Sequence, residues 1–212
     1  MAHADRARDA ESSEAPRALL FDLLMAIMNS LETWSSAVDG DLGIAWRDAV
    51  TDRMRVAGAY VAYDALVEEA ARDLGLPTTA VRRLRDGWAR MRPWPDAAAL
   101  ARLSLPYAFV TNCSTALAGQ ASRRSGFAPR FTLSAEEAGW YKPSAEIYRQ
   151  ACARIGSDPG HTLFVAGADY DAAGADAAGL TAWLVPRRPL ARHLQTGIRR
   201  LRSLEDLVAD VR

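Results

Sequence analysis

Residues 18–22 of the chain are Ala-Leu-Leu-Phe-Asp, a short apolar run that ends in a carboxylate. Two later stretches have the same form. Residues 107–112 are Tyr-Ala-Phe-Val-Thr-Asn, and residues 162–165, Thr-Leu-Phe-Val, lead into a turn that carries two aspartates. Short apolar runs without polar alternation are typical of strands buried inside a parallel sheet. The three stretches therefore predict buried parallel strands.

Helical patterns lie between and after these runs, at residues 114–125, 143–155 and 171–178. Two further short runs, residues 130–133 and 181–185, predict additional strands. Strands that alternate with helices predict an α/β fold with a doubly wound, Rossmann-like parallel sheet.

Ligands bind such sheets at the carboxyl ends of the strands. We therefore expect the polar residues that follow the three runs to converge at one edge of the sheet. These residues are Asp22, Thr111, Asn112, Asp169 and Asp171.

The hydrophobic pattern of the sequence changes between residues 34 and 92. This stretch has no strand-like run, and its apolar residues recur at helical spacing through 44–60, 63–74 and 78–91. We interpret residues 34–92 as a helical cap inserted into an α/β core of residues 17–33 and 93–212, preceded by a loose N-terminal tail of residues 1–16.

Composition narrows the class of protein. The formal net charge of the 212 residues is zero, which argues against a nucleic-acid partner. The arginine clusters at 82–92 and 187–202 are interpreted as solvated helix faces. Cys113 and Cys152 form no disulfide framework and suit a reducing, cytoplasmic location. No apolar run is long enough for a membrane span, and residues 1–16 lack the apolar stretch of a signal peptide.

Lys142 is the only lysine among the 26 Lys and Arg residues of the chain. Arginine presents a broad planar fork, whereas lysine carries a compact charge on a flexible stem. A single lysine within Trp-Tyr-Lys-Pro therefore indicates a site that a guanidinium does not fit, and the alternative is an isolated surface residue.

With these residues in place, the chain resembles the haloacid dehalogenase superfamily, and within it the L-2-haloacid dehalogenases that carry a helical cap. The resemblance extends over residues 17–208. It rests on the order of Leu-Leu-Phe-Asp at 19–22, Trp46-Arg47, Pro-Trp-Pro-Asp at 93–96, Val-Thr-Asn at 110–112, Ser-Ala-Glu-Glu-Ala-Gly-Trp-Tyr-Lys-Pro at 134–143, Glu146-Ile147-Tyr148 and the stretch from Phe164 to Gly179.

The resemblance implies that Asp22 is a nucleophile that forms an ester with the substrate, which water then cleaves. Without it, an aspartate at a strand end is more often a turn former or a helix N-cap. Lys142 would keep Asp22 ionised, and Asp171 would help to orient the lysine and the hydrolytic water. Asp169 lies two residues earlier and competes with Asp171 for this role.

The resemblance also implies a substrate that carries a carboxylate. Arg47 would bind this group, because a guanidinium fork matches a carboxylate. Arg53 and Arg55 lie nearby, so the sequence leaves open which of the three arginines occupies this position. Thr111 and Asn112 would bind the substrate carboxylate or the departing halide. Tyr148 matches a tyrosine of the dehalogenase pattern, and its alternative is a core residue of a helix.

Four residues depart from the patterns of the superfamily. Leu24 replaces the aspartate that phosphatases of the superfamily use as a general acid, so a phosphatase and its magnesium requirement lose support. Halide leaves without a proton, and Leu24 therefore suits a dehalogenase. Ala26 replaces the threonine of the dehalogenase pattern, and Ala166 and Ala168 replace a serine and an asparagine that position water.

We therefore expect a hydrolase of the 2-haloacid dehalogenase type that acts on a small carboxylate with no cofactor or metal, as a possible homodimer. One alternative is a phosphatase that uses magnesium. The other is a catalytically impaired binding protein, which the three alanines favour.

Overall fold

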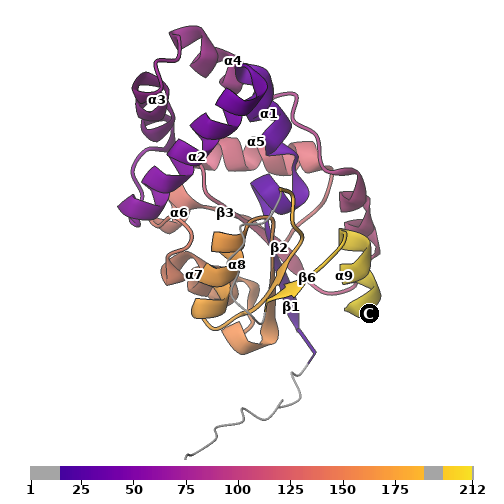
Figure 1. The fold of residues 1–212 in the computed structure, drawn as a ribbon. Coiled ribbons are helices and arrows are strands. Elements are labelled where there is room, and N and C mark those ends of the chain that lie inside the picture. The colour runs from indigo at the N-terminus through magenta and orange to yellow at the C-terminus, as the bar shows by residue number, and fades with distance from the viewer. Residues whose placement is uncertain (1–14, 189–197, 212) are drawn as a thin grey trace, which may run out of the picture.

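The strands form one parallel sheet in the order β3-β2-β1-β4-β5-β6 in the computed structural model, which describes residues 15–188 and 198–211. Helices flank this sheet, and a group of helices stands above it (Figure 1). The predicted α/β fold with a helical cap is confirmed. The strands are β1 Ala18–Asp22, β2 Tyr107–Thr111, β3 Thr132–Ser134, β4 Thr162–Ala166, β5 Thr181–Leu184 and β6 Arg199–Arg200.

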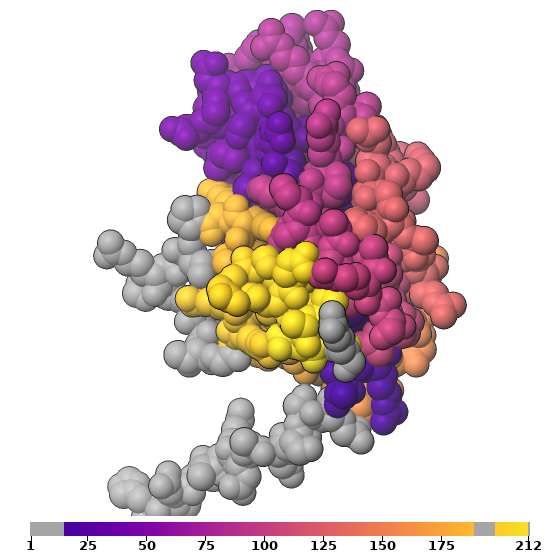
Figure 2. Space-filling model, turned by 90° about the vertical axis from the view of Figure 1, so that its right-hand side faces the viewer, coloured from indigo at the N-terminus to yellow at the C-terminus, as the bar shows by residue number. Residues whose placement is uncertain are grey.

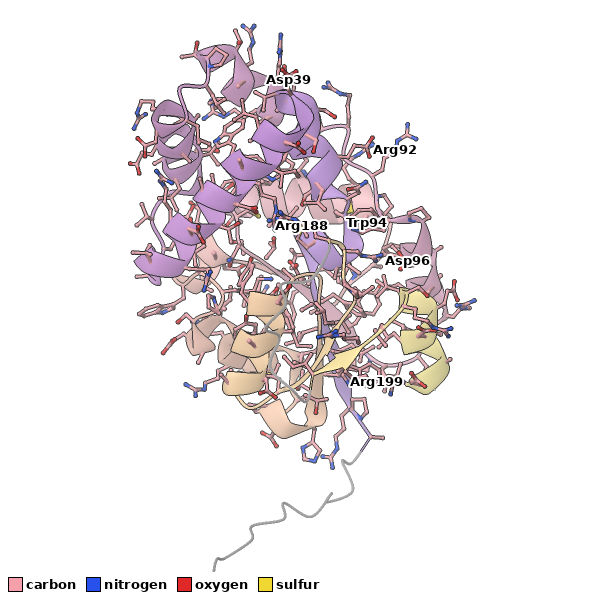
Figure 3. The ribbon with its side chains drawn as sticks, viewed as in Figure 1. Asp39, Arg92, Trp94, Asp96, Arg188 and Arg199 are labelled. Carbon is pink, nitrogen blue, oxygen red and sulfur yellow. The ribbon has the colours of Figure 1, made fainter. Side chains whose placement is uncertain are left out.

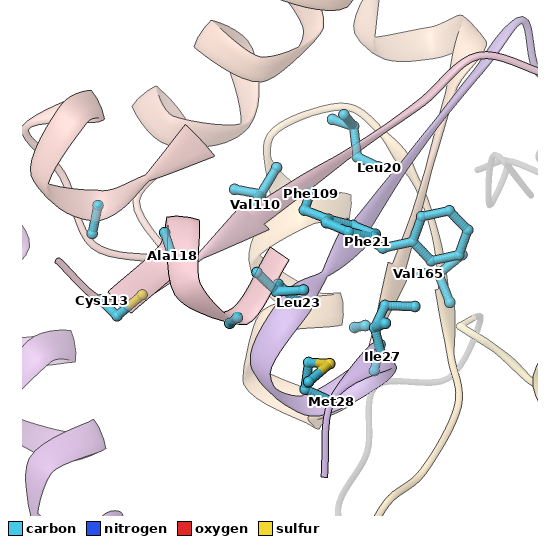
Figure 4. Close-up of a cluster of buried hydrophobic side chains, with 14 of the residues drawn as sticks. Leu20, Phe21, Leu23, Ile27, Met28, Phe109, Val110, Cys113, Ala118 and Val165 are labelled. Carbon is cyan, nitrogen blue, oxygen red and sulfur yellow. The ribbon is translucent and has the colours of Figure 1, made fainter. Parts of the chain in front are cut away.

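The centre of the sheet is apolar, and β1 lies there between β2 and β4 and pairs with both. In this register Phe21 lies beside Phe109 on one side and Val165 on the other, and all three side chains are fully buried. Figure 4 shows the cluster that these side chains form with residues beyond the end of β1, among them Leu23 and Ile27. This cluster surrounds β1, whose last residue is Asp22.

The core helices agree with the sequence patterns to within about two residues. They are α5 Thr115–Ser125, α7 Ala145–Ile155 and α8 Asp169–Ala177, with the short α6 Ala135–Ala138 before α7. The α5 helix begins at Ser114, whose side chain accepts a hydrogen bond from Leu117 N, and ends at Gly126, where φ is 76°. Turns η2 Pro95–Arg102 and η3 Pro159–His161 are 3₁₀ helices.

The structure contains several elements that the sequence patterns did not predict. A π-helix, η1 Leu23–Ile27, directly follows Asp22. Helix α9 Leu204–Asp210 packs against η2, and Figure 2 shows this yellow C-terminal segment against the magenta region. For its described arginines, the interpretation of the second cluster, 187–202, as a helix face was wrong, and residues 189–197 lie outside the described residues. Arg199 and Arg200 form β6, and Arg187 and Arg188 lie in a loop with carboxylate partners. No helix in the described ranges has the length and apolar character needed to cross a membrane.

The cap consists of α1 Ser30–Ala37, α2 Gly40–Ala57, α3 Tyr63–Asp73 and α4 Thr78–Trp88. Its centre is aromatic: the ring of Trp34 meets Trp46 edge-on at 5.0 Å and Trp88 at 5.7 Å. Helix α1 was not predicted. It packs so closely on α2 that a Cβ at Gly43 would lie 2.3 Å from the carbonyl oxygen of Trp34.

The chain enters and leaves the cap at neighbouring points. Met28 and Pro93 form an antiparallel bridge, and Asn29 N donates to Arg92 O. The two segments that connect the core to the cap are thus hydrogen-bonded to each other beside η1. The residue limits 1–16, 17–33, 34–92 and 93–212 remain predictions. The first 14 residues of the tail lie outside the described residues.

Candidate active site

Three charged side chains meet at the carboxyl end of the sheet. Lys142 Nζ lies 3.0 Å from Asp22 Oδ1 and 2.5 Å from Asp171 Oδ2, and it also donates to Val110 O at 3.4 Å. Asp22 ends β1, and Asp171 lies in the first turn of α8, which follows β4. Because β1 and β4 are adjacent and parallel, their ends present both carboxylates to one ammonium.

The backbone of Lys142 is held by Asn112, which follows β2. Lys142 N donates to Asn112 Oδ1 at 2.7 Å, and Asn112 Nδ2 donates to Lys142 O at 2.9 Å. The residues before Lys142 are tied to the cap, because Tyr141 N donates to Gly58 O at 2.7 Å and Tyr60 N donates to Gly139 O at 2.9 Å. The position of the lysine therefore depends on both the core and the cap.

Asp171 is fully buried, and both of its carboxylate oxygens have partners. Tyr148 donates its hydroxyl to Asp171 Oδ1 at 2.6 Å, and Lys142 binds the other oxygen. A Cβ at Gly174 would lie 2.4 Å from Pro143 Cβ, so glycine allows α8 to approach the Lys142-Pro143 segment. The geometry suits Asp171 to orient the lysine, and neither oxygen faces a cavity where water could be activated.

The electrostatics of this cluster follow from its burial. Burial by itself lowers the pKa of Lys142, but the carboxylates of Asp171 and Asp22 outweigh this effect and raise it above the usual range. Burial raises the pKa of Asp171 to about 6, although Lys142 opposes the shift. The ammonium thus stays charged at neutral pH and supplies a fixed positive charge beside Asp22.

A small cavity of about 40 Å³ opens beside Asp22. A water molecule needs roughly 10–15 Å³ on this scale, so the cavity has room for a ligand of a few heavy atoms. Asp22, Arg47, Asn112 and Lys142 are the charged and amide groups on its wall. The remaining lining is mostly apolar or aromatic: Leu24, Met25, Ser30, Trp34, Val50, Thr51, Met54, Tyr63 and Tyr170.

An open cleft of about 410 Å³ adjoins this cavity between cap and core. The cleft and the cavity share Met25, Arg47, Thr51 and Tyr170 on their walls. Asp169 lines the cleft and not the cavity. The cleft is therefore a route by which a ligand could reach Asp22 from solvent.

Arg47 is the member of the three candidate arginines that lines the small cavity. Its neighbour Trp46 is buried in the cap and donates its indole N–H to Val67 O at 3.0 Å, which orients α2. Arg55 lines only the open cleft, and Arg53 pairs with Asp73 on the cap surface. Geometry thus favours Arg47 for recognition of a carboxylate.

Two predicted substrate-binding residues lie away from the cavity. Thr111 is fully buried, and its hydroxyl lies 3.6 Å from Cys113 Sγ. Tyr148 is fully buried behind Asp171. Burial raises the pKa of Cys113 to about 12, so its thiol is not a nucleophile at neutral pH.

Of the residues that shape the cavity through apolar contact, Met25 and Trp34 were not predicted from sequence. Leu24 and Met25 belong to η1, and Trp34 and Tyr63 come from cap helices. Tyr170 lies next to Asp171, and burial raises its pKa to about 12. The position of Leu24 two residues after Asp22 was the one available signal, because the other apolar residues resemble ordinary core residues.

The π-helix η1 is held through its carbonyl groups. Trp94 donates its indole N–H to Met25 O at 2.9 Å, and Arg187 donates to Ala26 O at 2.7 Å. Arg187 also makes a bidentate pair with Asp96. Figure 3 shows Trp94 and Asp96 side by side at this edge of the core. Trp94 and Arg187 therefore hold in place the backbone of η1, which forms the cavity wall next to Asp22.

The two carboxylates of the site both contact Lys142. Within residues 15–188 and 198–211, no group of three or more His, Cys, Asp or Glu side chains could hold a metal ion. Asp22 and Asp171 are both bound by the ammonium of Lys142, which already supplies the positive charge between them. Leu24, which also lines the cavity, carries no side-chain oxygen.

Comparisons with known proteins agree with this architecture. A protein-family model described as HAD-hyrolase-like matches residues 139–188. No curated protein matches the sequence.

Several solved structures share the fold over nearly the whole chain. The L-2-haloacid dehalogenase PA0810 has a TM-score of 0.80 at 23% identity, covering 93% of this chain and 100% of that one. The L-2-haloacid dehalogenase from Xanthobacter autotrophicus with chloropropionic acid covalently bound has a TM-score of 0.80 at 18% identity, covering 92% and 97%. The putative HAD-hydrolase YfnB from Bacillus subtilis, bound to magnesium, has a TM-score of 0.76 at 18% identity, covering 93% and 99%.

The resemblance to the superfamily is thereby confirmed at the level of fold. The chain has the fold of the haloacid dehalogenase superfamily, in the capped form that the L-2-haloacid dehalogenases share.

Proposed function

We propose that this protein is a hydrolase that cleaves the carbon–halogen bond of small 2-haloalkanoic acids through an ester on Asp22. The observation that carries the proposal is a cavity of about 40 Å³ whose wall combines Asp22 and Lys142 from the core with Arg47 from the cap. A carboxylate nucleophile, an ammonium beside it and a guanidinium for the substrate carboxylate are the groups that this reaction needs.

In the first step, one oxygen of Asp22 attacks the carbon that carries the halogen. A carbon–oxygen bond forms, the carbon–halogen bond breaks, and halide leaves with the bonding electrons. Halide needs no proton, which is consistent with Leu24 on the cavity wall. Asn112 uses one amide hydrogen for Lys142 O, so its second N–H can face the departing halide.

In the second step, water attacks the carbonyl carbon of the Asp22 ester. The bond between that carbon and the ester oxygen breaks, and this oxygen leaves in the 2-hydroxy acid. The carboxylate of Asp22 is regenerated with one oxygen from water, and one proton is released. Among the described residues that line the cavity, Asp22 itself is the only carboxylate, and none is a histidine. Asp171 has both oxygens bound. We therefore propose that this step is slower than the first.

The cavity supports a substrate with two or three carbons. Trp34, Met54 and Tyr63 close the side that faces the cap, and a longer chain would have to displace them or extend into the open cleft. Haloacetates and 2-halopropionates are the expected substrates.

The alternative functions make different demands on the same site. A magnesium-dependent phosphatase of the usual kind needs a second acid near Asp22, and Leu24 cannot transfer a proton. A binding protein without turnover would use the same cavity and would form no ester. The fully buried Ala26 and Ala166 offer no polar side chain, which is the observation that favours this alternative.

The test is halide release from purified protein given fluoro-, chloro- and bromoacetate and each enantiomer of 2-chloropropionate, with and without EDTA. We expect EDTA-insensitive halide release that Asp22→Asn abolishes and Asp176→Asn, an exposed change in α8, leaves intact. Magnesium-dependent phosphate release from a phosphoester would support the phosphatase. Carboxylate binding without halide release or an Asp22 adduct would support the binding protein.

A further inference from the structure

The cap and the core are joined by an ion pair beside the active site. Arg188, in the loop after β5, donates from Nη1 to Asp48 Oδ1 at 2.6 Å and from Nη2 to Asp48 Oδ2 at 3.0 Å. Asp48 lies in the cap helix α2, and Arg188 lies 140 residues later in the core. Figure 3 shows Arg188 directly below α2.

The same carboxylate also binds Arg47. Arg47 Nη1 donates to Asp48 Oδ1 at 2.9 Å, so one oxygen of Asp48 accepts from two guanidinium groups. In the described part of the chain this is the only hydrogen bond recorded for the Arg47 guanidinium. Its orientation in the cavity therefore depends on where Asp48 is held, and the bidentate pair with Arg188 holds Asp48.

We propose that Asp48 and Arg188 are positioning residues that orient Arg47 for the carboxylate of the substrate; this inference rests on the proposed function. Asp48 links Arg188 of the core to Arg47 of the cap, so that the orientation of Arg47 depends on the position of the core. Arg188 also balances the charge of Asp48, so that the three side chains keep a net charge of one positive unit for the incoming anion. Asp48, Arg47 and Arg188 all line the open cleft.

A purely electrostatic effect of Asp48 and a positioning role predict opposite changes in carboxylate affinity for the Asp48→Asn variant. If only charge mattered, Asp48→Asn would strengthen carboxylate binding, because it removes a negative charge next to Arg47. If Asp48 orients Arg47, the same change weakens binding. Arg188→Gln weakens binding in both cases, and the double variant then separates them, because residues in one network are not additive.

The experiment measures the dissociation constant of propionate, an unreactive carboxylate, by calorimetry, together with KM and kcat for 2-chloropropionate. We expect Asp48→Asn and Arg188→Gln each to raise the dissociation constant and KM about tenfold, with a smaller effect on kcat, and the double variant to match the single ones. Arg188→Lys should recover part of the loss, because it keeps the charge without the bidentate geometry.

The matched control is Arg85→Gln. Arg85 pairs with Glu68 at 2.7 Å on the cap surface and makes no cap–core pair. It should leave propionate binding unchanged. Stronger binding in Asp48→Asn, or dissociation constants within about twofold of wild type in both single variants, would overturn the positioning role.

Hydrogen exchange separates this inference from the proposed function. Loss of the ion pair should increase amide exchange in α2, residues 40–57, in Arg188→Gln and not in Arg85→Gln, without any ligand present. If wild-type protein binds no propionate and releases no halide, the proposed function fails, and unchanged exchange in Arg188→Gln then overturns the role of the ion pair independently.

Discussion

Asn112 holds the backbone of Lys142 from both sides, accepting from Lys142 N at 2.7 Å and donating to Lys142 O at 2.9 Å. The sequence pattern suggested that Asn112 binds substrate. Its side chain also ties the end of β2 to the segment that carries the only lysine of the chain. The two roles predict different kinetics.

Asn112→Ala should lower kcat at least tenfold and leave KM nearly unchanged, because the ammonium shifts away from Asp22 while Arg47 remains in place. The free energy of unfolding should fall by about 1–3 kcal/mol, since two buried backbone groups lose their partners. Denaturant unfolding and halide release measure both quantities. Asn29→Ala is the control: it removes the N-cap of α1 and costs about 1 kcal/mol without an effect on kcat. A rise in KM alone would instead favour substrate binding by Asn112.

Lys142→Arg should reduce halide release by about two orders of magnitude, although the charge is kept. Lys142 is 1% exposed between two carboxylates and the ring of Phe164, which lies 5.4 Å from its Nζ. A guanidinium is too broad for this space, and overpacking should also cost about 1–3 kcal/mol of stability. Arg149→Lys, an exposed substitution on α7, is the control for an exchange between lysine and arginine. Near-normal turnover in Lys142→Arg would mean that the solitary lysine has no special role.

Tyr148→Phe should move the acid limb of the pH–rate profile to higher pH. The hydroxyl of Tyr148 donates to the ionised carboxylate of Asp171 and so lowers its pKa. In wild type we expect halide release to decline as the pH falls through about 6, because protonated Asp171 no longer balances Lys142. Without the hydroxyl the pKa of Asp171 rises further, and the decline begins at a higher pH.

The control for this profile is Tyr107→Phe, a half-buried tyrosine at the start of β2 and far from the carboxyl ends of the strands. An acid limb that stays in place in Tyr148→Phe would assign it to a group other than Asp171. A change in kcat without a shift of the profile would indicate altered packing alone.

Halide release should begin with a burst of about one equivalent per protein and continue more slowly, because Asp22 is the only carboxylate among the described residues that line the cavity. Rapid quenching and mass spectrometry should find the adduct on the peptide that contains Asp22. Ala168→Asn adds an amide on the wall of the adjoining cleft and should accelerate the slow phase. Linear release without an adduct would show that hydrolysis is the faster step.

Much of the core and part of the candidate site could be predicted from sequence. Buried strands such as β1 and β4 show as unbroken apolar runs, and the carboxyl ends of parallel strands converge by topology, so Asp22 and Asp171 were expected to lie together. Helix α1 and η1 were missed because their apolar residues carry no periodic signal over so few residues.

The sequence by itself determined the α/β core, the inserted helical region and the order of the charged residues, because these depend on local hydrophobic patterns and on motif order. Only the tertiary structure decided what each polar side chain does. Tyr148 and Thr111 are buried away from the cavity, Asn112 binds the backbone of Lys142, and Asp48 joins Arg47 to Arg188. The hydrogen bonds from Asn112 to Lys142 and from Arg188 to Asp48 join residues 30 and 140 positions apart, which no local pattern encodes.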